Sequence, residues 1–440
     1  MLLFIFILTI VLLILMIAKF KIHAFLSLLI AAIFFGIFSG LPLETVANTI
    51  TAGFGGTMQS IGIVIVCGVV IGEMLEVTGG AQKIADAILK LIGIKRATYA
   101  VSATGAFVSI PVFCDSGYVI LNPIIKGISR RGKIPFASLV VALMAGLLCT
   151  HSFVPPTPGP VAAAALLGAN IGKVMFMGII VSIPVVIVCS MWANSRFIKG
   201  AYPDIAPETA ADLEKEKEFN EIVAKAPTTF MSFIPIVVPI VLIVIASFFG
   251  NAEGNVVQSI LAFVGKPYIA LLIGTGLSFL LPTKITPTVT STWVAKALQG
   301  SAEILLITAA AGGFAKVLQA TTIGDTLTGL ILGTGLPAIL IPYVMAALLN
   351  IAQGSATVAL TTVAGIMAPM LVTLGLSPEI TVLAIAAGSL SFCHTNSSYF
   401  WCVSKLAGFE LNQSYKVITL TSVIMGGVAM VAISLLSFIF

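Results

Sequence analysis

The sequence predicts an all-α polytopic membrane protein. We expect two inverted-topology repeats, each of about five transmembrane helices plus a re-entrant hairpin, with broken helices at the membrane midplane. Hydrophobic residues make up 59% of the 440 residues, charged residues only 9%, and mean hydropathy is +1.14. A soluble domain carries roughly 25% charged residues, so this composition favours a membrane protein. A repeated polar pattern and the placement of basic residues are the other two observations that support the prediction.

The repeated pattern consists of two polar interruptions of apolar sequence. They are Thr150–Pro160 in the first half and Cys393–Trp401 in the second. His151 and His394 lie 243 positions apart, although the chain holds only three histidines. The same offset relates Lys173 to Lys416, Val174 to Val417, Leu75 to Leu318 and Thr78 to Thr321. Duplicated halves with matching breaks are typical of secondary transporters, whose binding site lies between the repeats.

The remaining composition excludes several kinds of site. The net charge of +5 comes from basic residues scattered between apolar segments, so it indicates topology and no nucleic-acid partner. The six cysteines all fall in apolar stretches without CxxC spacing: Cys67, Cys114, Cys149, Cys189, Cys393 and Cys402. Free, packed thiols are expected, with no disulfide, no metal site and no cofactor.

One strongly polar region divides the chain. Residues 194–229 combine many charged residues with Pro203, Pro207 and Pro227, as a solvated connector does. We therefore expect a first membrane repeat over residues 1–193, a cytoplasmic linker over 194–229 and a second repeat over 230–440. The linker is expected to hold at most one short surface helix, and a regulatory site there is the less favoured alternative.

Basic residues orient the first half, because lysine and arginine favour the cytoplasmic side of a membrane. No basic residue precedes the first apolar stretch, so it does not resemble a signal peptide. Lys19 and Lys21 follow it, which predicts an amino terminus outside. The predicted spans are Leu2–Ala18, Ala24–Ser39, Thr57–Glu76, Pro135–Asn170 with a break at His151–Pro160, and Val174–Trp192. An interfacial helix carries Lys83, Lys90, Lys95 and Arg96.

The segment Ala97–Ile125 is expected to be a re-entrant hairpin. As one straight helix its 29 residues would extend about 44 Å, well beyond the hydrocarbon thickness. Basic residues flank both of its ends, and Pro111 and Cys114–Gly117 interrupt its middle. A hairpin with Asp115 at its tip satisfies these observations. A broken full crossing is the rival, and it would place four basic residues outside.

The second half is expected to run in the opposite orientation. It begins inside at Phe230–Phe249, turns outside at Asn251–Asn255, returns by about Leu281 and crosses again through Ser301–Leu318. A second hairpin, about Leu336–Leu374, is broken at Asn350–Thr357, and a second broken span covers Ser377 to about Ala407. The last span ends outside at Phe440, so both termini are predicted outside.

The four breaks predict a binding site for a small hydroxylated carboxylate. Unwound backbone is tolerated at membrane depth only where protein or a water-filled cavity supplies hydrogen-bond partners. Each break exposes a half-helix N-terminus, which binds carboxylates, and nearby hydroxyl and amide groups suit a polyhydroxylated solute. The candidate substrate-binding residues are Ser116, Gly117, Ser152, Pro156, Thr157, Gln353, Gly354, Ser355, Thr357, Asn396, Ser397 and Ser398.

Three residues are candidates for proton coupling: Asp115, His151 and His394. An ionised carboxylate at the depth of Asp115 is costly and repels an anion, so Asp115 is expected to take up a proton with substrate. Asp115 has two structural alternatives, to cap the second half-helix of the hairpin or to pair with a buried base. Each histidine has the alternative of a packed, hydrogen-bonded side chain.

These segments resemble the gluconate permease family, the GntP type of proton-coupled symporters, over nearly the whole chain. Pro111–Val119, Val154–Pro160 and Asn396–Trp401 carry the resemblance, and the proline-rich break is the most specific of them. The resemblance implies uptake of gluconate or related sugar acids and hydroxy acids across the bacterial cytoplasmic membrane, with D-serine in one branch, usually with a proton. The chain is also similar to a wider ion transporter superfamily, in which hairpins and broken helices build the site, usually in a homodimer.

Two departures from the family pattern bear on coupling. The family break usually reads Pro-Pro-His-Pro-Gly-Pro, whereas Thr157 stands where that histidine would. The second segment usually reads Asn-Asp-Ser-Gly-Phe-Trp, whereas Ser397 replaces the acid and Tyr399 the glycine. Two candidate proton carriers are therefore missing. We expect Asp115 to carry the proton, or sodium to replace it.

Other classes of membrane protein fit the sequence less well. An intramembrane protease needs paired aspartates, Gly-x-Ser-Gly with a histidine, or His-Glu-x-x-His, and the sequence lacks these patterns. A channel seldom needs two inverted hairpins that meet at the midplane. A cation/proton antiporter shares the breaks but usually places more acids at its centre. We therefore expect a transporter and no enzymatic activity.

Overall fold

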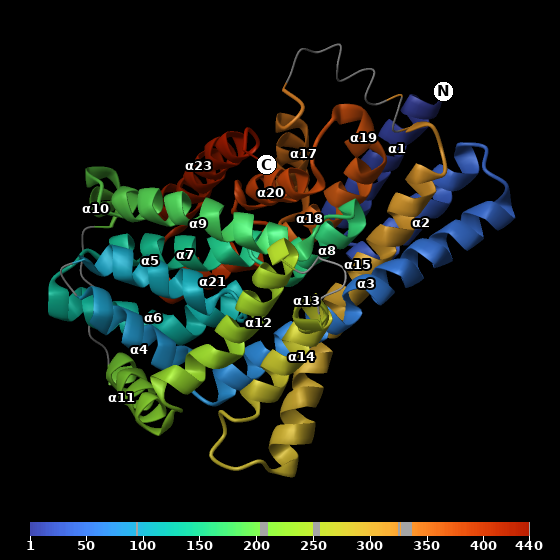
Figure 1. Ribbon diagram of the computed structural model, residues 1–440. Helices are drawn as coiled ribbons and strands as arrows, with labels where there is room; N and C mark the ends of the chain where they lie inside the picture. The colour runs from blue at the N-terminus through green and yellow to red at the C-terminus, as the bar shows by residue number, and fades with distance from the viewer. Residues whose placement is uncertain (94–95, 203–209, 250–255, 324–325, 327–336, 440) are drawn as a thin grey trace.

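The computed structural model describes residues 1–93, 96–202, 210–249, 256–323, 326 and 337–439. Every regular element in these ranges is a helix (Figure 1). Seven helical segments of the described chain are long and apolar enough to cross a membrane, or eight if one bent pair counts as a single span. The predicted all-α polytopic architecture is therefore confirmed.

The first half begins with two short apolar helices and one long helix. They are α1 (Leu2–Ile14, continued by a π-helical turn over Leu15–Lys19), α2 (Ala24–Phe38) and α3 (Leu43–Val77). The prediction that the third span begins at Thr57 is wrong, because α3 begins at Leu43 and has 35 residues. The polar residues before Thr57 fit the helix because they bond to it. Thr51 Oγ1, for example, donates to the carbonyl of Ala47 at 3.1 Å.

The rest of the first half contains the hairpin, the broken span and the linker helices. They are α4 (Gly80–Ile92), α5 (Ala97–Val108), α6 (Cys114–Gly132), α7 (Phe136–Phe153), α8 (Pro158–Leu167), α9 (Ile171–Ala193), α10 (Arg196–Ala201) and α11 (Ala210–Lys225). Figure 1 shows α5 and α6 side by side, and both pack on α7. This arrangement agrees with the predicted hairpin. The linker contains two helices where at most one was expected.

The second half repeats this order. It comprises α12 (Thr229–Phe249), α13 (Val256–Val264), α14 (Pro267–Ser278), a π-helical segment Thr288–Trp293, α15 (Val294–Gln319), α17 (Leu340–Gln353), α18 (Ala356–Met367), a 3₁₀ turn Ala368–Met370, α19 (Leu371–Leu374), α20 (Pro378–Leu390), α21 (Ser398–Ala407), α22 (Leu411–Ser414), a π-helical turn Tyr415–Thr419 and α23 (Leu420–Leu436). α13 and α14 bend by 70°. The predicted turn over 251–255 and the predicted hairpin start at Leu336 lie outside the described residues.

The offset seen in the sequence also relates the helices. Adding 243 to the first residues of α2, α5 and α7 gives 267, 340 and 379, and α14, α17 and α20 begin at 267, 340 and 378. Each half therefore contains a hairpin followed by a broken span. The division into domains at residues 193 and 229 stays a prediction.

The two halves pack together most extensively where α3 crosses α15. A Cβ at Gly53 would lie 2.3 Å from the carbonyl oxygen of Gly312 and 2.8 Å from Cβ of Lys316, so only glycine fits there. Elsewhere on the crossing, Nζ of Lys296 lies 2.8 Å from Oε1 of Glu73. The two contacts are related by the offset of 243: adding it to position 53 gives 296, and subtracting it from position 316 gives 73. The same contact therefore occurs twice, as a two-fold relation between the repeats requires.

The first arms of the two broken spans form the centre of the molecule. Every residue of α7 except His151 is buried, and so is every residue of α20 from Ile380 to Leu390. The adjacent hairpins cover these arms, since α5 packs on α7 and α17 packs on α20. The break at the end of α7 consequently lies inside protein, whereas the break after α20 is exposed at Asn396.

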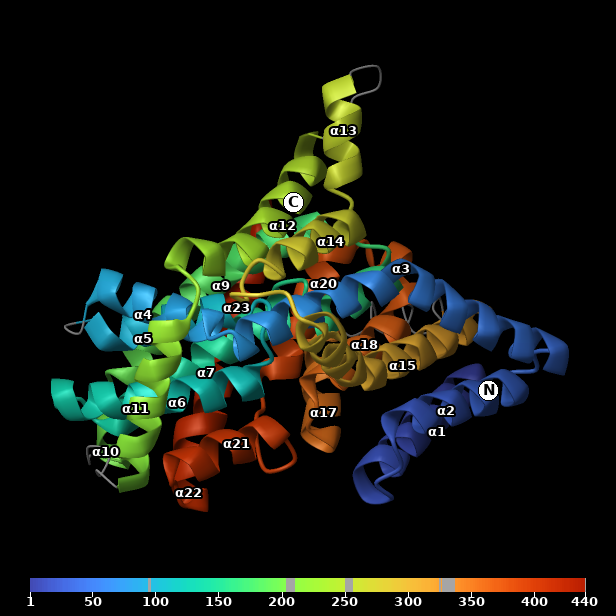
Figure 2. The ribbon, with the colours of Figure 1, turned by 90° about the horizontal axis from the view of Figure 1, so that it is seen from below.

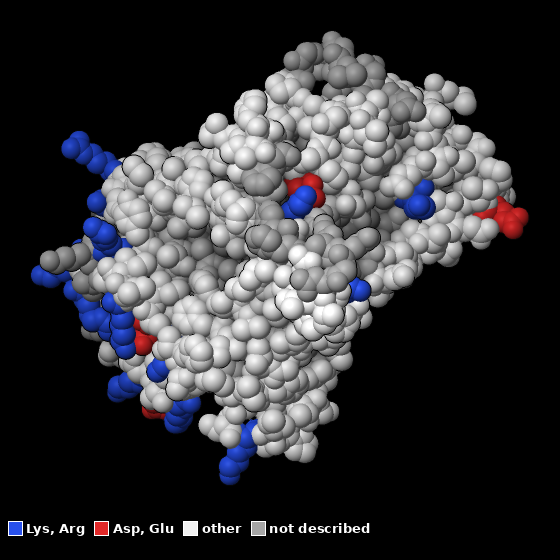
Figure 3. All heavy atoms as spheres, viewed as in Figure 1, with Lys and Arg blue, Asp and Glu red and all other residues white. Residues whose placement is uncertain are grey.

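Basic side chains gather at one end of the molecule. Figure 3 shows Lys and Arg over the region of α4, α5, α6, α10 and α11, while most of the visible face is uncharged. We call this region the basic end, and it is defined by Lys90, Lys126, Arg130, Arg131, Lys133, Arg196 and Lys199. Figure 2 shows α11 beside α4 and α6, on which it packs. The basic end is the one expected to face the cytoplasm.

Candidate functional site

The two breaks of the first repeat lie against α3. A Cβ at Gly72 would lie 2.2 Å from the carbonyl oxygen of Pro111, and a Cβ at Gly68 would lie 3.2 Å from Cβ of Pro156. These glycines, one turn apart, let both breaks approach the helix. The cavity between the segments has a volume of only about 10 Å³, which is room for about one water molecule. The first-repeat side of the site is therefore closed.

The two breaks of the second repeat contact each other directly. Asn396 Nδ2 donates to the carbonyls of Ile351 at 3.1 Å and Ala352 at 3.4 Å. Gly354 has φ +83°, and a Cβ there would lie 2.1 Å from the carbonyl oxygen of Asn396. The loop of the broken span is thus held against the tip of the hairpin. Asn396 and Ser398 are exposed on the surface of the chain.

Half-helices of opposite repeats pair across the centre. α8 packs on α18, where a Cβ at Gly159 would lie 3.7 Å from Cα of Thr357. α6 packs on α21, where Cys402 Sγ lies 3.8 Å from the carbonyl oxygen of Asp115. The rings of Tyr118 and Tyr399 meet edge-on at 6.3 Å in the same contact. Four half-helix N-termini, two from each repeat, therefore gather between the halves.

These N-termini differ in how their backbone N–H groups are used. Ser355 Oγ accepts from the N–H of Val358 at 3.4 Å and so caps α18. The residues before α6, α8 and α21 provide no side-chain cap, which leaves first-turn N–H groups for a ligand. α8 contributes least, because Pro158 and Pro160 have no N–H. The α6 and α21 ends are the better anion sites.

Asp115 lies in the first turn of α6, with its side chain partly buried. The nearest polar partner of its Oδ2 is Cys114 Sγ at 3.8 Å. Among the described residues no lysine, arginine or histidine lies within ion-pair distance of it. The alternative of a buried basic partner is therefore not found there. A negative charge near a helix N-terminus is favourable, so a purely local role stays open beside proton coupling.

The two offset-related histidines have different surroundings. His151 lies in the last turn of α7, and its Nδ1 is buried without a hydrogen-bond partner among the described groups. His394 lies in the loop before α21, with Nε2 3.1 Å from the carbonyl oxygen of Ile351. The prediction that the first break begins at His151 is wrong, because Val154 N still donates to Thr150 O at 2.9 Å. That break covers residues 154–157.

The structure places the other candidate residues unequally. Ser116, Gln353, Ser355 and Thr357 are partly buried at half-helix ends, Pro156, Thr157, Gly354 and Ser397 are buried in or beside the breaks, and Asn396 and Ser398 are exposed. Gly117 faces packed protein, since a Cβ there would lie 2.6 Å from Cδ2 of Leu147. Ser152 is 1% exposed and its hydroxyl has no partner among the described residues. Gly117 thus lies against α7, and the role of both residues in substrate binding stays a prediction.

Sequence reasoning missed several residues that build the site. Gly68 and Gly72 shape the wall on α3, and their spacing of four in an apolar span was the available signal. Tyr118 is fully buried, and its hydroxyl finds no partner in the described part of the chain. The Tyr399 hydroxyl donates to the carbonyl of Met144 at 3.3 Å. Tyr399 stands where the resembling family has glycine, and it fills the contact between α6 and α21.

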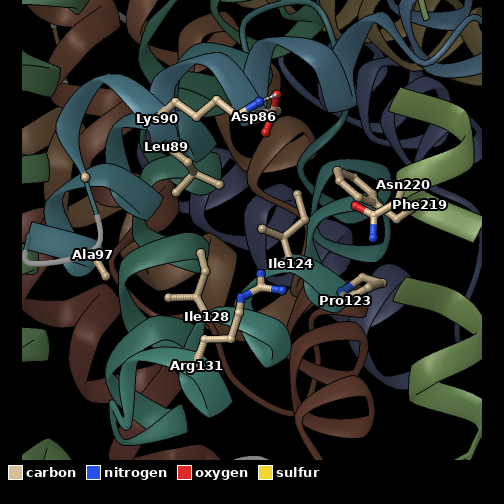
Figure 4. Close-up of a pocket in the computed structure, with 11 residues that line it drawn as sticks. Asp86, Leu89, Lys90, Ala97, Pro123, Ile124, Ile128, Arg131, Phe219 and Asn220 are labelled. Carbon is tan, nitrogen blue, oxygen red and sulfur yellow. Dashed lines mark hydrogen bonds and ion pairs between the residues drawn. The ribbon is translucent and has the colours of Figure 1, made fainter. Parts of the chain in front are cut away.

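A separate pocket of about 210 Å³ lies between α4, α5, α6 and α11. Figure 4 shows Phe219 and Asn220 of α11 facing Pro123 and Ile124 of α6 across it. Lys90 Nζ forms an ion pair with Asp86 Oδ2 at 2.7 Å on its wall. None of the twelve candidate substrate-binding residues lines this pocket, so it is distinct from the central site.

Comparisons with known proteins find close sequence relatives. A family model described as GntP family permease matches residues 1–439. An "Uncharacterized permease" of Haemophilus influenzae is 34% identical, covering 97% of this chain and 90% of that protein. A "Gluconate permease" of Pseudomonas aeruginosa is 31% identical (98% and 96% covered), and a "High-affinity gluconate transporter" of Escherichia coli strain K12 is 32% identical (92% of each).

A solved structure shares the fold. The YdaH transporter of Alcanivorax borkumensis, described as having an unusual topology, matches with TM-score 0.65 over 94% of this chain and 97% of that one. Sequence identity is 15%, so this likeness concerns the fold alone. It agrees with the helical arrangement described above.

Proposed function

This chain belongs to the GntP family of permeases, and on that premise we propose that it is a secondary active symporter that imports gluconate or a related hydroxylated carboxylate with a proton. The observation that carries the proposal is the meeting of four half-helix N-termini from both repeats, beside Asp115. Relatives named as gluconate permeases and a gluconate transporter support the choice of substrate class. The chain is a transport protein and no enzyme.

The substrate carboxylate is held by the N-termini of α6 and α21 in this proposal. Their first turns lack side-chain caps, and aligned peptide dipoles place partial positive charge there. Ser116, Ser398 and Asn396 are polar groups close to these ends that suit the hydroxyls of a sugar acid. A polyhydroxylated anion thus matches both the charge and the hydrogen-bonding capacity of the site.

Asp115 couples transport to the proton in this proposal. Its carboxylate has no basic partner among the described residues and lies in the first turn of the helix that receives the anion. Two negative charges in one membrane-depth site repel each other, so substrate binding favours the protonated carboxyl. The proton and the anion then cross together without a net buried charge.

The closed state of the first-repeat side implies a conformational step. A cavity of about 10 Å³ beside Pro111 and Pro156 cannot hold a sugar acid. The contacts of Gly68 and Gly72 with the two breaks must therefore loosen when substrate passes. Alternating access between the two sides of the breaks meets this requirement.

Two alternatives within the same fold remain as proposals. Sodium replaces the proton in the first, since carbonyl oxygens such as those of Ile351 and Ala352 face the second-repeat loop. A glycerate or D-serine type of substrate replaces gluconate in the second, since all of these molecules carry a carboxylate and a hydroxyl. A homodimer in the bacterial cytoplasmic membrane is also expected from the family.

Proteoliposome uptake tests these proposals together. Purified protein is reconstituted and supplied with labelled gluconate, glycerate or D-serine under an imposed pH gradient or sodium gradient. We expect gluconate to accumulate against its gradient when the pH gradient is imposed. Accumulation only with sodium would support the first alternative, and saturable uptake of glycerate or D-serine but not gluconate would support the second. No uptake of any carboxylate would contradict the proposed function.

A further inference from the structure

A second cavity lies between α6 and α21, on the side of the helix breaks that faces the basic end. Its volume is about 480 Å³, within the range of small-molecule sites. α6 and α21 touch near their N-termini, where Asp115 and Cys402 meet. The cavity begins one turn later on α6, at Val119, which is about 6 Å along the helix from Asp115. It therefore adjoins the central site.

The polar groups of this cavity match a hydroxylated carboxylate. Gln82 and Asn122 line it and are each only 6% exposed. Their side-chain oxygens have no hydrogen-bond partner among the described residues, and buried unpaired acceptors are costly. Ligand hydroxyl groups are the donors they lack. Lys126 and Lys405 line the same cavity, and Lys405 forms no ion pair with any described residue.

Three of these four polar positions have apolar counterparts in the other half of the molecule, and the fourth, Gln82, corresponds to Asp325, which lies outside the described residues. Adding 243 relates Asn122 to Gly365 and Lys126 to Pro369, and subtracting 243 relates Lys405 to Ala162. Ala162 is fully buried, and a Cβ at Gly365 would lie 3.3 Å from the carbonyl oxygen of Ala311. If the fold alone determined these positions, the two halves would carry similar residues. The two halves therefore differ at Asn122, Lys126 and Lys405.

The linker helix α11 completes the cavity. Glu218, Phe219 and Ile222 form its remaining wall. α11 is held in place by Lys83, whose Nζ donates to the carbonyl of Val223 at 3.4 Å. Lys405, which forms no ion pair with any described residue, provides a positive charge that favours an anion. The linker thus supplies part of a site as well as a connection.

We propose that this cavity is a second binding site for the transported carboxylate, on the cytoplasmic side of the helix breaks. Lys405 pairs with the carboxylate, and Gln82 and Asn122 accept hydrogen bonds from the hydroxyls. The inference rests on the proposed function, since it takes the same substrate class. Substrate released from the central half-helix ends reaches this site before it leaves the protein.

Transport measured from each face separately tests the proposal. Labelled gluconate uptake is followed in right-side-out and inside-out membrane vesicles that contain Lys405→Gln or wild-type protein. We expect KM at the cytoplasmic face to rise about three- to tenfold in Lys405→Gln, since one charge-assisted contact is lost. KM at the outer face should change by less than about twofold, because the lost contact lies only on the inner path. Lys90→Gln is the matched control, since it removes the same charge at the same end but lines the other pocket.

The outcomes separate this proposal from the proposed function. Gluconate transport with an unchanged cytoplasmic KM in Lys405→Gln would contradict the second site alone, and so would an equal shift at both faces or an equal effect of Lys90→Gln. Absence of carboxylate transport by the wild-type protein would contradict the proposed function itself. Asn122→Leu tests the hydroxyl contacts. It should reduce the preference for gluconate over hexanoate, as inhibitors at the cytoplasmic face, by about tenfold.

A thiol-labelling measurement tests the proposal independently, in case the variants above fold poorly. Val119 lines the cavity and is 53% exposed, so Val119→Cys should be tolerated. An anionic thiol reagent should modify this cysteine, and gluconate should slow the reaction while the same concentration of uncharged sorbitol does not. The wild-type protein reports the background from its own cysteines. Equal rates with and without gluconate would contradict the proposal.

Discussion

At the scale of single residues, the helix that packs against a break determines where each polar side chain points. Pro111 and the following polar residues predicted the hairpin tip, and the structure places Asp115 in the first turn of α6. The same reasoning nominated Gly117, yet a Cβ there would lie 2.6 Å from Cδ2 of Leu147. The direction in which a side chain points depends on which helix packs against it. That partner lies far away in the sequence, so a list of polar residues near a break always includes packing positions.

Asp115→Asn should uncouple transport from the proton. The amide keeps the shape of the side chain and cannot exchange a proton, so pH-gradient-driven accumulation of gluconate should fall at least about tenfold. Gluconate exchange between preloaded and external pools should persist, because it needs no net proton movement. Both rates are measured in proteoliposomes between pH 5.5 and 8. An unchanged pH dependence of uptake in the variant would show that Asp115 does not carry the proton.

Gly72→Ala should destabilise the protein, while Gly62→Ala should not. The added Cβ at Gly72 would lie 2.2 Å from the carbonyl oxygen of Pro111, whereas nothing lies within 4 Å of a Cβ at Gly62. Both changes lie in α3, so the helix-propensity gain of about 1 kcal/mol is common to them. We expect about 1–3 kcal/mol lower stability for Gly72→Ala than for Gly62→Ala. Thermal unfolding in detergent measures the difference, and equal midpoints would contradict the close contact.

At the scale of helices, the sequence predicted well those that form from long apolar stretches flanked by basic residues. The hairpin α5–α6, the broken span α7–α8 and their counterparts α17–α18 and α20–α21 all form where the sequence indicated. The start of α3 was missed because its first turns are polar, and a period of apolar residues alone cannot show that threonine hydroxyls bond back to the helix. The docking of α11 on α4 and α6 was missed for a similar reason, since its contacts come from the tertiary fold.

The α3–α15 crossing provides a test at this scale. Glu73 is 10% exposed and lies 2.8 Å from Lys296, although the geometry at Glu73 Oε1 falls short of a hydrogen bond. Lys296→Met leaves that carboxylate without its partner and should cost about 1–3 kcal/mol of stability. The double variant Glu73→Gln with Lys296→Met should recover most of the loss. A double-mutant cycle of unfolding free energies measures the coupling, and additive effects would indicate that the pair contributes nothing.

The whole molecule combines a two-fold arrangement of helices with an uneven distribution of charge. The repeat could be predicted because two rare histidines kept one offset, and the helix starts of both halves follow it. The sequence could not predict that the first-repeat side is closed while the second-repeat side is exposed. That difference depends on which of two related packings the helices form.

Orientation in the membrane is tested by labelling from outside. Lys199 on α10 and Lys416 in the π-helical turn before α23 belong to neighbouring segments, whereas Glu44 lies in the first turn of α3, far from the end of that helix at Val77. An impermeant maleimide should label Glu44→Cys in intact cells, and Lys199→Cys and Lys416→Cys only after the membrane is opened. Labelling of Lys199→Cys and Lys416→Cys from opposite faces would contradict the topology.

The meeting of Gly53 with Gly312 has a mechanical consequence. Main chain lies against main chain there, with the β-carbons of Thr57 and Lys316 beside the contact and no long side chain between the two glycines. Sliding of α3 along α15 would drive peptide groups into each other at this contact. Rotation of the two helices about the contact would keep the peptide groups apart. We therefore expect the two halves to move relative to each other by rotation about this crossing. A small rotation about the Gly53–Gly312 contact would displace the helix breaks farther than the two glycines, because the breaks lie farther from the axis of rotation.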